Sequence, residues 1–503
     1  MSMIQEILTN CAEKNPTLEA LVGGTKRYTF KEYNERVNQM AHYLLSIGVQ
    51  KGNMVGLLCK NNHPVPTIVM AAIKIGAVAV PFSWQLTSFE IQDLFETSKP
   101  DILFYDEEFS GLIKEAQEKH IISHMIKTGV GFDTTDDYDK IFSTYPIYEP
   151  NITLTGEETA VMLFTSGTTG NSKACMITHN SLDSYYKQAG KLPVKEGWRF
   201  LAVHPLFHMS GITNILNAIT NKMTMVFEID SKPQTIWNTI EREQINMMLA
   251  FPSVYMYMLE ELKNRGQKPD CFKVAAAGGT KVPKSLIQQY LGYDILMMQG
   301  YGSTEAWAVS GWHPGMGLDK IESVGKPLPG VQVKIVDPDT GDSLSQGQIG
   351  EIMVKSPYVF KGYWRNKDAT NQVFNDNWFR MGDAGRIDED GYIYIMGRYK
   401  DVIVRGGDNV YPIQLEETIQ HVDGVLEVAV VGMPDDLWGE IPVAYIVKDS
   451  SSSLTKEAVI SYCRERVASY KVPKVEFIQQ LPKNVLGKVF KRKLKDQIRT
   501  PSN

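Results

Sequence analysis

Short apolar segments alternate with helical patterns up to about residue 320, and this alternation constrains the fold more than any other feature of the sequence. The apolar segments 160–164, 223–229 and 272–279 have the character of buried strands, and the stretch 282–293 has apolar residues at helical intervals. Buried strands that alternate with helices are typical of parallel sheets covered by helices. The sequence therefore predicts layered α/β architecture for this part of the chain.

One helix near the N-terminus is marked at both ends. Thr29 and Glu32 have the spacing of a capping box, apolar residues then recur at helical intervals, and Gly48 follows the last of them. This pattern predicts an amphipathic helix between Thr29 and Gly48.

The pattern changes after about residue 320 to strands separated by glycines. Segments 331–337, 350–356 and 385–398 alternate apolar and polar residues, and Asp390-Gly391 is a strong hairpin signal. A smaller β subdomain is expected here.

The last hundred or so residues have the pattern of a separate α+β unit. A helix is expected at 412–420, strands at 425–432 and 442–449, and a second helix at 454–467. Only this change of pattern marks a boundary, which we put near Lys400.

Composition excludes several classes of protein. A chain of 503 residues has room for about three domain-sized units. Its 52 Lys and Arg residues stand against 58 Asp and Glu residues, a net charge of −6, so no overall basic field favours nucleic acid as a partner.

Cysteine usage and hydropathy bear on location. The five cysteines are scattered and contain no CxxC pair, which fits a reducing compartment and predicts a cytoplasmic protein. The N-terminus lacks the pattern of a signal peptide, and Lys74 and Pro81 interrupt the longest apolar stretch, 68–82. Neither export nor a membrane span is expected.

The most informative motif is LFTSGTTGNSK at 163–173. Gly167 and Gly170 let backbone amides approach an anion, the hydroxyl residues add donors, and Lys173 adds a cation. The motif differs from a Walker loop because Lys173 follows Gly170 by three residues. It is a candidate phosphate cradle, and a plain surface loop is the alternative at this point.

A second motif is QGYGSTEAW at 299–307. Tyr301 offers a flat face to a base, Thr304 offers a hydroxyl, and Glu305 is a carboxylate suited to Mg²⁺ that bridges phosphate oxygens. The alternative for Glu305 is a solvated loop residue.

Two further motifs lie toward the C-terminus. Asp383 can accept hydrogen bonds from a ribose diol, and Arg398 can bind ribose or phosphate. Lys488 follows Gly487 in a tail, 471–503, that has nine basic residues against two acidic ones. That tail is either a solvated basic face or a source of cations that meet polyphosphate in a cleft.

These motifs together resemble those of the ANL superfamily of adenylate-forming enzymes, which comprises acyl- and aryl-CoA synthetases, nonribosomal-peptide adenylation domains and luciferases. TSGTTGNSK, YGSTE, MGD, GRYKD and PKNVLGK occur in that family's order and spacing, and the resemblance covers nearly the whole chain. It implies a large N-terminal domain, here 1–399, and a small mobile C-terminal domain, here 400–503. It also implies two half-reactions: a carboxylate and MgATP give an acyl-adenylate and pyrophosphate, and a thiol then displaces AMP.

The resemblance implies an ATP-binding role for residues in each motif. Those that match the loop around the β- and γ-phosphates are Thr165, Ser166, Gly167, Thr168, Thr169, Gly170 and Lys173. Those that match the adenine side are Gly278, Gly279, Thr280, Tyr301 and Gly302. Thr304 matches the α-phosphate position, Glu305 the Mg²⁺ position, and Asp383 and Arg398 the ribose positions.

The resemblance also implies the parts that act on the acid and on coenzyme A. Lys488 resembles the lysine that bridges the substrate carboxylate and the α-phosphate, and Lys400 sits at the hinge position. Rotation there is expected to bring Gly406 and Gly407 to the site, where they leave room for pantetheine. His208 matches a position beside the acyl group.

The expected function is ATP-dependent ligation of a small-molecule carboxylic acid to CoA, with ATP, Mg²⁺ and CoA as cofactors. The residues that resemble the acyl pocket are His208, Met209, Tyr255, Trp307 and Val309. They are mostly bulky and apolar, and Trp307 can shorten a tunnel, so a short-to-medium aliphatic or aromatic acid is expected. The alternatives are an enzyme that loads a separate carrier protein and a non-catalytic nucleotide-binding protein. A homodimer is left open.

Overall fold

The computed structural model describes residues 4–116, 122–165, 172–189, 194–406, 408–435, 437–483 and 489–496. The chain divides into two compact units. The first comprises residues 1–321, 327–332 and 355–379, and the second comprises 322–326, 333–354 and 380–503. The β subdomain therefore groups with the C-terminal segment.

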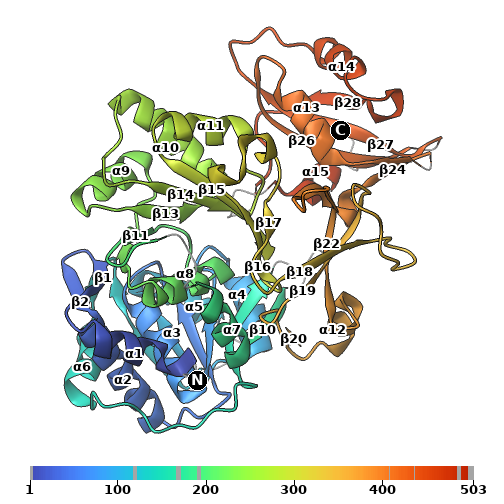
Figure 1. Ribbon diagram of the computed structural model, residues 1–503. Helices are drawn as coiled ribbons and strands as arrows, with labels where there is room; N and C mark the ends of the chain where they lie inside the picture. The colour runs from blue at the N-terminus through green and yellow to red at the C-terminus, as the bar shows by residue number, and fades with distance from the viewer. Residues whose placement is uncertain are drawn as a thin grey trace. The chain divides into compact units, whose positions relative to one another are not determined.

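A nine-stranded sheet, eight strands of which lie wholly in the first unit, forms one layer of that unit (Figure 1). In spatial order its strands there are β16 (Trp307–Trp312), β15 (Leu296–Ser303), β14 (Val274–Gly278), β13 (Met247–Ala250), β11 (Arg199–Ala202), β12 (Thr224–Phe227), β1 (Glu19–Gly23) and β2 (Lys26–Thr29). The strands from β15 to β1 are parallel, and β16 and β2 pair antiparallel to their neighbours. The predicted parallel α/β architecture is confirmed.

A seven-stranded sheet forms a second layer. Its spatial order is β20 (Gly362–Tyr363), β10 (Lys173–Thr178), β9 (Thr159–Thr165), β4 (Val78–Pro81), β3 (Met54–Leu58), β5 (Ile102–Tyr105) and β6 (His124–Lys127). Strands β9 to β6 are parallel, whereas β10 runs antiparallel to both β9 and β20.

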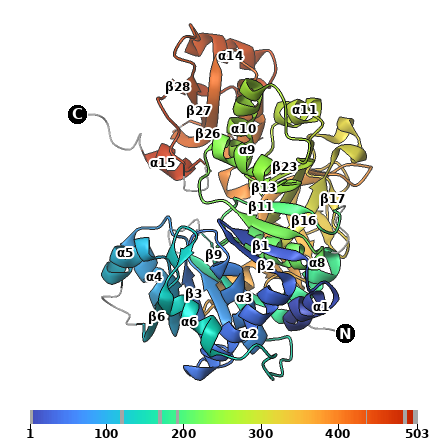
Figure 2. The ribbon, with the colours of Figure 1, turned by 90° about the vertical axis from the view of Figure 1, so that its left-hand side faces the viewer.

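Helices fill the space between the two sheets and cover their outer faces (Figures 1 and 2). The inner helices are α1 (Ile7–Lys14), α2 (Phe30–Ser46), α3 (Pro64–Ile75), α7 (His179–Ala189) and α8 (Met209–Thr220). The outer helices are α9 (Pro233–Arg242), α10 (Pro252–Arg265) and α11 (Lys284–Gly292) on one sheet, and α4 (Ser88–Ser98) and α5 (Ser110–Ala116) on the other. Short helices α6 (Asp136–Thr144) and α12 (Lys367–Val373) complete the unit.

The helix α2 confirms the N-terminal prediction. Thr29 caps it with an extended backbone, its hydroxyl accepts from the Glu32 amide, and the Glu32 carboxylate accepts from the Thr29 amide. The capping box thereby gives a partner to two backbone amides, those of Thr29 and Glu32, that have no acceptor within the helix. Gly48, at φ +89°, follows the end of the helix.

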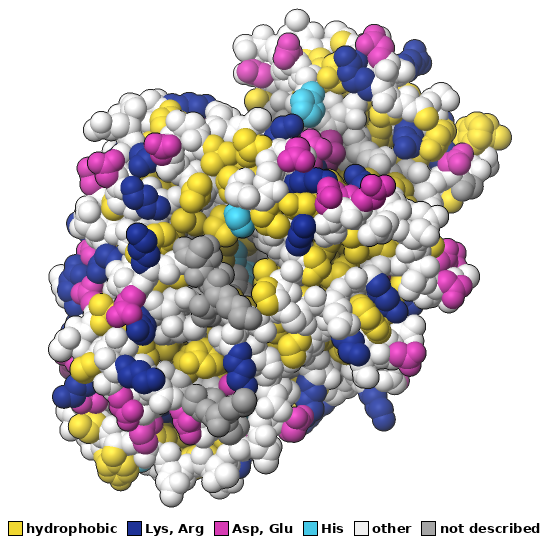
Figure 3. Space-filling view, in the orientation of Figure 1, with side chains coloured by type: hydrophobic (Ala, Val, Ile, Leu, Met, Phe, Trp, Pro, Cys, Tyr) yellow, Lys and Arg dark blue, Asp and Glu magenta, His cyan; other side chains and the backbone are white. Residues whose placement is uncertain are grey.

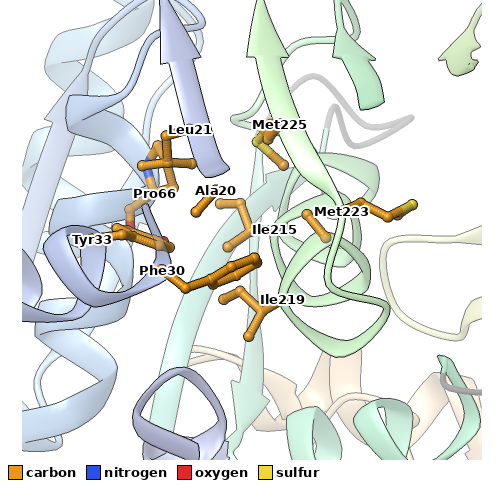
Figure 4. A pocket seen from close by; sticks show the side chains of 10 residues that line it. Ala20, Leu21, Phe30, Tyr33, Pro66, Ile215, Ile219, Met223 and Met225 are labelled. Atoms are coloured by element: carbon orange, nitrogen blue, oxygen red, sulfur yellow. The ribbon is translucent and has the colours of Figure 1, made fainter. Parts of the chain in front are cut away.

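A small apolar cavity lies between the inner helices and the nine-stranded sheet (Figure 4). Its volume is about 10 Å³. It is lined by Ala20, Leu21, Phe30, Tyr33, Pro66, Ile215, Ala218, Ile219, Met223 and Met225. A void with such a wall stays dry, so it is a packing defect rather than a ligand site.

The second unit contains the β subdomain. Its strands are β18 (Gln332–Val336), β19 (Gly350–Lys355), β22 (Trp378–Ile387) and β23 (Ile393–Arg398). Strands β22 and β23 form the predicted hairpin, with Gly391 at φ +84° in its turn. Gly391 is explained by the turn, because tight hairpin turns need a residue with a positive φ and glycine adopts one without steric cost.

The C-terminal part of the second unit is the expected α+β structure. Its sheet has the order β25 (Asp408–Val410), β24 (Ile403–Arg405), β27 (Gly439–Lys448) and β26 (Val425–Asp435), and β28 (Lys474–Phe477) pairs with β27. Helices α13 (Pro412–Gln420), α14 (Lys456–Arg464) and α15 (Lys491–Asp496) pack with it. Both faces of β26 are buried, because Val430 belongs to one apolar cluster and Ala429 and Val431 belong to another.

Surface charge and hydropathy agree with the composition. Over the face drawn in Figure 3, Lys and Arg side chains are interspersed with Asp and Glu. Within the described ranges, no helix combines the length and the apolar character that a membrane crossing requires.

Candidate active site

The carboxyl ends of four neighbouring parallel strands bring eight of the expected residues together. Strands β11, β13, β14 and β15 lie side by side and end at the same edge of the sheet. The residues that follow these ends are His204, His208, Phe251, Gly278, Gly279, Thr280, Tyr301, Gly302, Thr304 and Glu305. Open α/β sheets bind ligands at this edge.

Glycines allow close packing where β14 ends. Gly279 has φ +83°, and a Cβ atom there would lie 2.8 Å from the ring of Phe251. Gly278 pairs with Gly300 of β15, and Thr280 is exposed beside them. The strand ends therefore leave an open edge beside Tyr301, where a base could stack.

A tight turn between β15 and β16 presents Thr304 and Glu305, which are both half-buried. A Cβ atom on Gly302 would lie 1.7 Å from the carbonyl oxygen of Trp307, so only glycine fits. The Ala306 amide donates to the Ser303 hydroxyl at 3.1 Å. The turn thus holds both side chains at the edge of the sheet.

Glu305 and Lys173 meet at one tyrosine. The Tyr363 hydroxyl donates to Glu305 Oε1 at 2.9 Å, and Lys173 Nζ lies 4.9 Å from the centre of the Tyr363 ring. Tyr363 is 6 % exposed, and its strand β20 pairs with β10 through Cys175. The two motifs, 132 positions apart in the chain, therefore belong to one cluster.

The ends of the candidate phosphate loop face each other across two strands. Thr165 ends β9, Lys173 begins β10, and the Thr165 hydroxyl donates to the Lys173 carbonyl at 3.3 Å. The predicted loop residues Ser166, Gly167, Thr168, Thr169 and Gly170 lie outside the described residues. Lys173 begins β10, and its ammonium lies over the ring of the tyrosine that donates to Glu305.

Two histidines follow β11, of which His204 is buried and His208 is half-buried. His208 caps α8, lies 4.5 Å from the Phe207 ring centre and 5.8 Å from that of His204, and burial lowers its pKa to about 4. Burial, together with His208, lowers the pKa of His204 to about 3. Both imidazoles are therefore neutral at pH 7.

An asparagine from the other sheet positions this segment. The Asn61 amide donates to the carbonyls of Ala202 and His204 at 2.9 and 2.8 Å, and its oxygen accepts from the Leu206 amide at 3.0 Å. Since Asn61 is 8 % exposed, these contacts are shielded from water. We regard it as a positioning residue for His204 and His208.

The other residues expected to line the acyl pocket are all buried. Met209 begins α8, and Val309 lies in β16, where its carbonyl accepts from the Leu328 amide at 2.9 Å. Trp307 packs against Tyr185 and Tyr358. Tyr255 instead donates its hydroxyl to the Met248 carbonyl at 2.7 Å and packs on Tyr290, contacts that belong to the outer helix layer.

The ribose candidates pair with each other within the second unit. Asp383 and Arg398 face each other in β22 and β23, and Arg398 Nε lies 3.0 Å from Asp383 Oδ1. A second Arg398 nitrogen, Nη1, donates to the Met381 carbonyl at 3.0 Å. The carboxylate of Asp383, which is 6 % exposed, therefore has a fixed direction.

The hinge and the CoA candidates also lie in the second unit. Lys400 is exposed in a single 3₁₀ turn, Tyr399–Asp401, and partial desolvation lowers the pKa of its ammonium. Gly406 has φ +60°, and a Cβ atom there would lie 2.9 Å from Trp438. Gly407 and Lys488 lie outside the described residues.

The donor set fits a magnesium ion that is held mainly by phosphates. Among the described residues, no group of three His, Cys, Asp or Glu side chains could hold a metal ion by itself. Mg²⁺ commonly keeps several waters and binds one or two carboxylates together with substrate phosphates. Glu305, with one oxygen on Tyr363 and a cation nearby, fits that requirement.

Sequence reasoning missed Tyr363, Asn61 and Phe251. Each acts through a contact between distant segments, and Tyr363 lies 58 positions from Glu305. None of the three belongs to a motif whose spacing can be recognised in the sequence. Pairing of β20 with β10 is what makes Tyr363 part of the site.

Comparisons with known proteins agree with this geometry. The family model "AMP-binding enzyme" matches residues 8–364, and the model "AMP-binding enzyme C-terminal domain" matches residues 414–488. The chain is 45% identical to the "Putative acyl--CoA ligase YdaB" of Bacillus subtilis over 99% of both chains. It is 31% identical to the "Long-chain-fatty-acid--CoA ligase FadD13" of Mycobacterium tuberculosis, also over 99% of both.

A solved structure is similar over almost its whole length. O-succinylbenzoate coenzyme A synthetase (MenE) from Bacillus subtilis, in complex with ATP and magnesium ion, superposes with a TM-score of 0.85 at 27% identity. The match covers 98% of this chain and 99% of that one. The layered N-terminal part and the small C-terminal part thus follow a known fold.

Proposed function

Because this chain belongs to the family of AMP-binding enzymes and is an ATP-dependent acyl-CoA ligase, we propose that the carboxyl ends of β11, β13, β14 and β15 bind its acid and ATP. The observation that carries this proposal is the cluster of Lys173, Tyr363 and Glu305, in which a cation and a carboxylate both contact one tyrosine. Such a pair suits a polyphosphate and the divalent cation that accompanies it.

In the first half-reaction, a carboxylate oxygen of the acid attacks the α-phosphorus of ATP. A phosphorus–oxygen bond forms, the bond to pyrophosphate breaks, and an acyl-adenylate results. Lys173 neutralises charge on the departing phosphates, Thr304 donates to the α-phosphate, and Glu305 holds Mg²⁺. When bound, Mg²⁺ neutralises phosphate charge. The protein's contribution is therefore positioning and charge neutralisation.

In the second half-reaction, the thiol of CoA attacks the acyl carbonyl and AMP leaves, so that a thioester replaces the mixed anhydride. Asp383 and Arg398 bind the ribose throughout. Lys488 bridges the two anions only in the first step, and a rotation at Lys400 between domains 1–399 and 400–503 brings Gly406 and Gly407 to the thiol. The exposed 3₁₀ turn around Lys400 supports a hinge at that position.

The acid is a short-to-medium aliphatic or aromatic one, in contact with His208, Met209, Val309, Trp307 and Tyr255. Support comes from the burial of Trp307, which is 2 % exposed and packs on Tyr185 of α7. A long-chain acid is the alternative, in line with the name of one relative, a long-chain-fatty-acid--CoA ligase. Tyr255 is the weakest member of the set, because its hydroxyl is bonded to the Met248 carbonyl of β13 and its ring packs on Tyr290 of the outer helix α11.

A panel of acids tests the function. The assay measures AMP and acyl-CoA formed from ATP, CoA and acids of graded length. Activity with C₁₀ and shorter or aromatic acids, and little with C₁₆, is expected. Higher activity with C₁₆ than with the shorter or aromatic acids would contradict the proposed substrate class but not the proposed ligase activity. Parallel assays with free CoA and with a phosphopantetheinylated carrier protein distinguish a CoA ligase from a carrier-loading enzyme. ATP–pyrophosphate exchange distinguishes both enzymes from a non-catalytic protein.

The two-pose mechanism has its own test. Lys488→Ala removes a preorganised cation and should slow acyl-adenylate formation by about 10²–10³-fold, while preformed acyl-adenylate and CoA still react at the wild-type rate. Lys400→Pro should impede the thiol step instead. Equal loss of both steps in Lys488→Ala would contradict the mechanism.

The remaining proposals concern assembly and location. All five cysteines are free, which supports a reducing, cytoplasmic location. A homodimer is the proposed assembly, and light scattering tests it directly.

A further inference from the structure

Trp307 has a backbone conformation that bulky residues seldom adopt. Its φ is +61°, and it follows directly on the turn that presents Thr304 and Glu305. Non-glycine residues in this region cost free energy, and they concentrate at functional sites. Because Gly302 already packs against the Trp307 carbonyl, the turn is fixed and so is the direction of the indole.

Two tyrosines hold the indole in place. The ring centres of Tyr185 and Tyr358 lie 5.1 and 5.9 Å from that of Trp307. The Tyr185 hydroxyl donates to Asn217 of α8 at 3.3 Å, and the Tyr358 hydroxyl donates to the Ala308 carbonyl at 3.1 Å. Both tyrosine hydroxyls therefore have acceptors.

The indole N–H of Trp307 is different, because it is buried and has no acceptor. The residue is only 2 % exposed, so bulk water cannot serve. Native structures pair nearly all such donors with protein groups, with ordered water or with a ligand. An unpaired donor at a strained position calls for one of these partners.

Helix α8 carries two more unpaired groups. Nε2 of His208, at its N-terminus, and Nδ2 of Asn214, which is 5 % exposed, are both buried without a partner. The same helix binds Tyr185, the neighbour of Trp307, through Asn217. Unsatisfied polar atoms thus recur along the element beside which the acid is proposed to bind.

We propose that the acid carries an oxygen in its acyl portion, and that this oxygen accepts a hydrogen bond from the indole N–H of Trp307. The substrate class is then a hydroxy-, oxo- or alkoxy-substituted acid rather than a plain hydrocarbon acid. This inference rests on the proposed function, because it takes α8 and Trp307 as the surroundings of the acyl group. The competing explanation is a buried water molecule that stays in place when the acid binds.

Matched pairs of acids test the proposal. Each pair has the same length or ring, and one member has a carbonyl or an ether oxygen where the other has a methylene. The wild-type enzyme should favour one oxygenated member by about tenfold in kcat/KM, because its hydrocarbon counterpart leaves the buried donor unpaired. The position of the favoured oxygen along the series reports the distance from the carboxylate to Trp307.

Trp307→Phe keeps an aromatic ring and removes the N–H. It should abolish the preference within the favoured pair, with a smaller change for the hydrocarbon member. Trp364→Phe is the matched control, since its indole nitrogen is likewise buried without a partner but packs in a different apolar cluster. That variant should keep the preference.

The outcomes separate this inference from the proposed function. Equal use of both members by the wild type, or a preference that survives in Trp307→Phe, would overturn the inference while ligation stands. No acyl-CoA from any acid would overturn the proposed function itself. If Trp307→Phe does not fold, a crystal structure of the wild type with the favoured acid decides: an acid oxygen within 3.2 Å of Nε1 supports the proposal, and water in that place refutes it.

Discussion

The hydroxyl of Tyr363 gives a direct test of the site, because it donates to Glu305, the proposed ligand of Mg²⁺. It donates to Glu305 Oε1 at 2.9 Å from a side chain that is 6 % exposed. Tyr363→Phe removes that one atom and leaves the ring under Lys173. The carboxylate then loses the contact that fixes its direction.

A hydrogen bond to an ionised group contributes about 1.5–3 kcal/mol, which corresponds to about 10–100-fold in rate or affinity. We therefore expect ATP–pyrophosphate exchange to slow by that factor, and its half-saturating Mg²⁺ concentration to rise. The reaction of preformed acyl-adenylate with CoA should be unchanged, since it needs no Mg²⁺. Exchange rates measured over a range of Mg²⁺ concentrations give both quantities.

Tyr33→Phe is the matched control. Its hydroxyl is buried too, but donates to the neutral Pro66 carbonyl at 3.1 Å, away from the strand ends. Tyr33→Phe should lose about 1 kcal/mol of unfolding free energy, and Tyr363→Phe about 1.5–3 kcal/mol. Only Tyr363→Phe should alter the response to Mg²⁺. If the two variants behave alike in exchange, Tyr363 does not position Glu305 and the reasoning fails.

Three further predictions follow from other parts of the molecule. Glu305→Gln supplies a poorer ligand for a hard cation, so exchange should need more Mg²⁺; an unchanged Mg²⁺ titration would argue against a metal role. Burial lowers the pKa of His63 to about 3. As the pH falls, His63 is therefore protonated in the unfolded chain before it is protonated in the folded protein. Stability should therefore fall as the pH drops below about 6.5, and His63→Asn should remove about 2 kcal/mol of the loss between pH 7 and pH 5 in denaturant titrations. Ile219→Ala enlarges an existing cavity and should cost about 3–5 kcal/mol in the same assay; a loss under 1 kcal/mol would mean that the wall collapses.

Local signals were sufficient to predict individual elements. The capping box at Thr29 and Glu32 marks the start of α2, and Asp390-Gly391 marks the turn between β22 and β23. Each of these features is decided by residues within three or four positions of one another. The helix expected at 412–420 also has those bounds in the structure.

Contacts between motifs could not be predicted in the same way. The sequence motifs predict that Lys173 binds phosphate and that Glu305 binds Mg²⁺, but Tyr363 joins the two only because β20 pairs with β10. Strand pairing over such separations depends on the whole topology, and a single sequence carries no spacing rule for it. The turn at Trp307 is a further case, since neither its positive φ nor its unpaired N–H follows from residue type.

The pairing of Asp383 with Arg398 illustrates how such a contact changes an interpretation. From the sequence each residue was a separate ligand for ribose or phosphate, yet the two form an ion pair across β22 and β23. An arginine committed to a carboxylate and to the Met381 carbonyl has less capacity to bind phosphate. Its main effect is then to hold Asp383 in one orientation, in which it could accept from a ribose diol. Replacing Arg398 should consequently weaken nucleotide binding through Asp383, so the double variant should lose little more than Asp383→Asn alone.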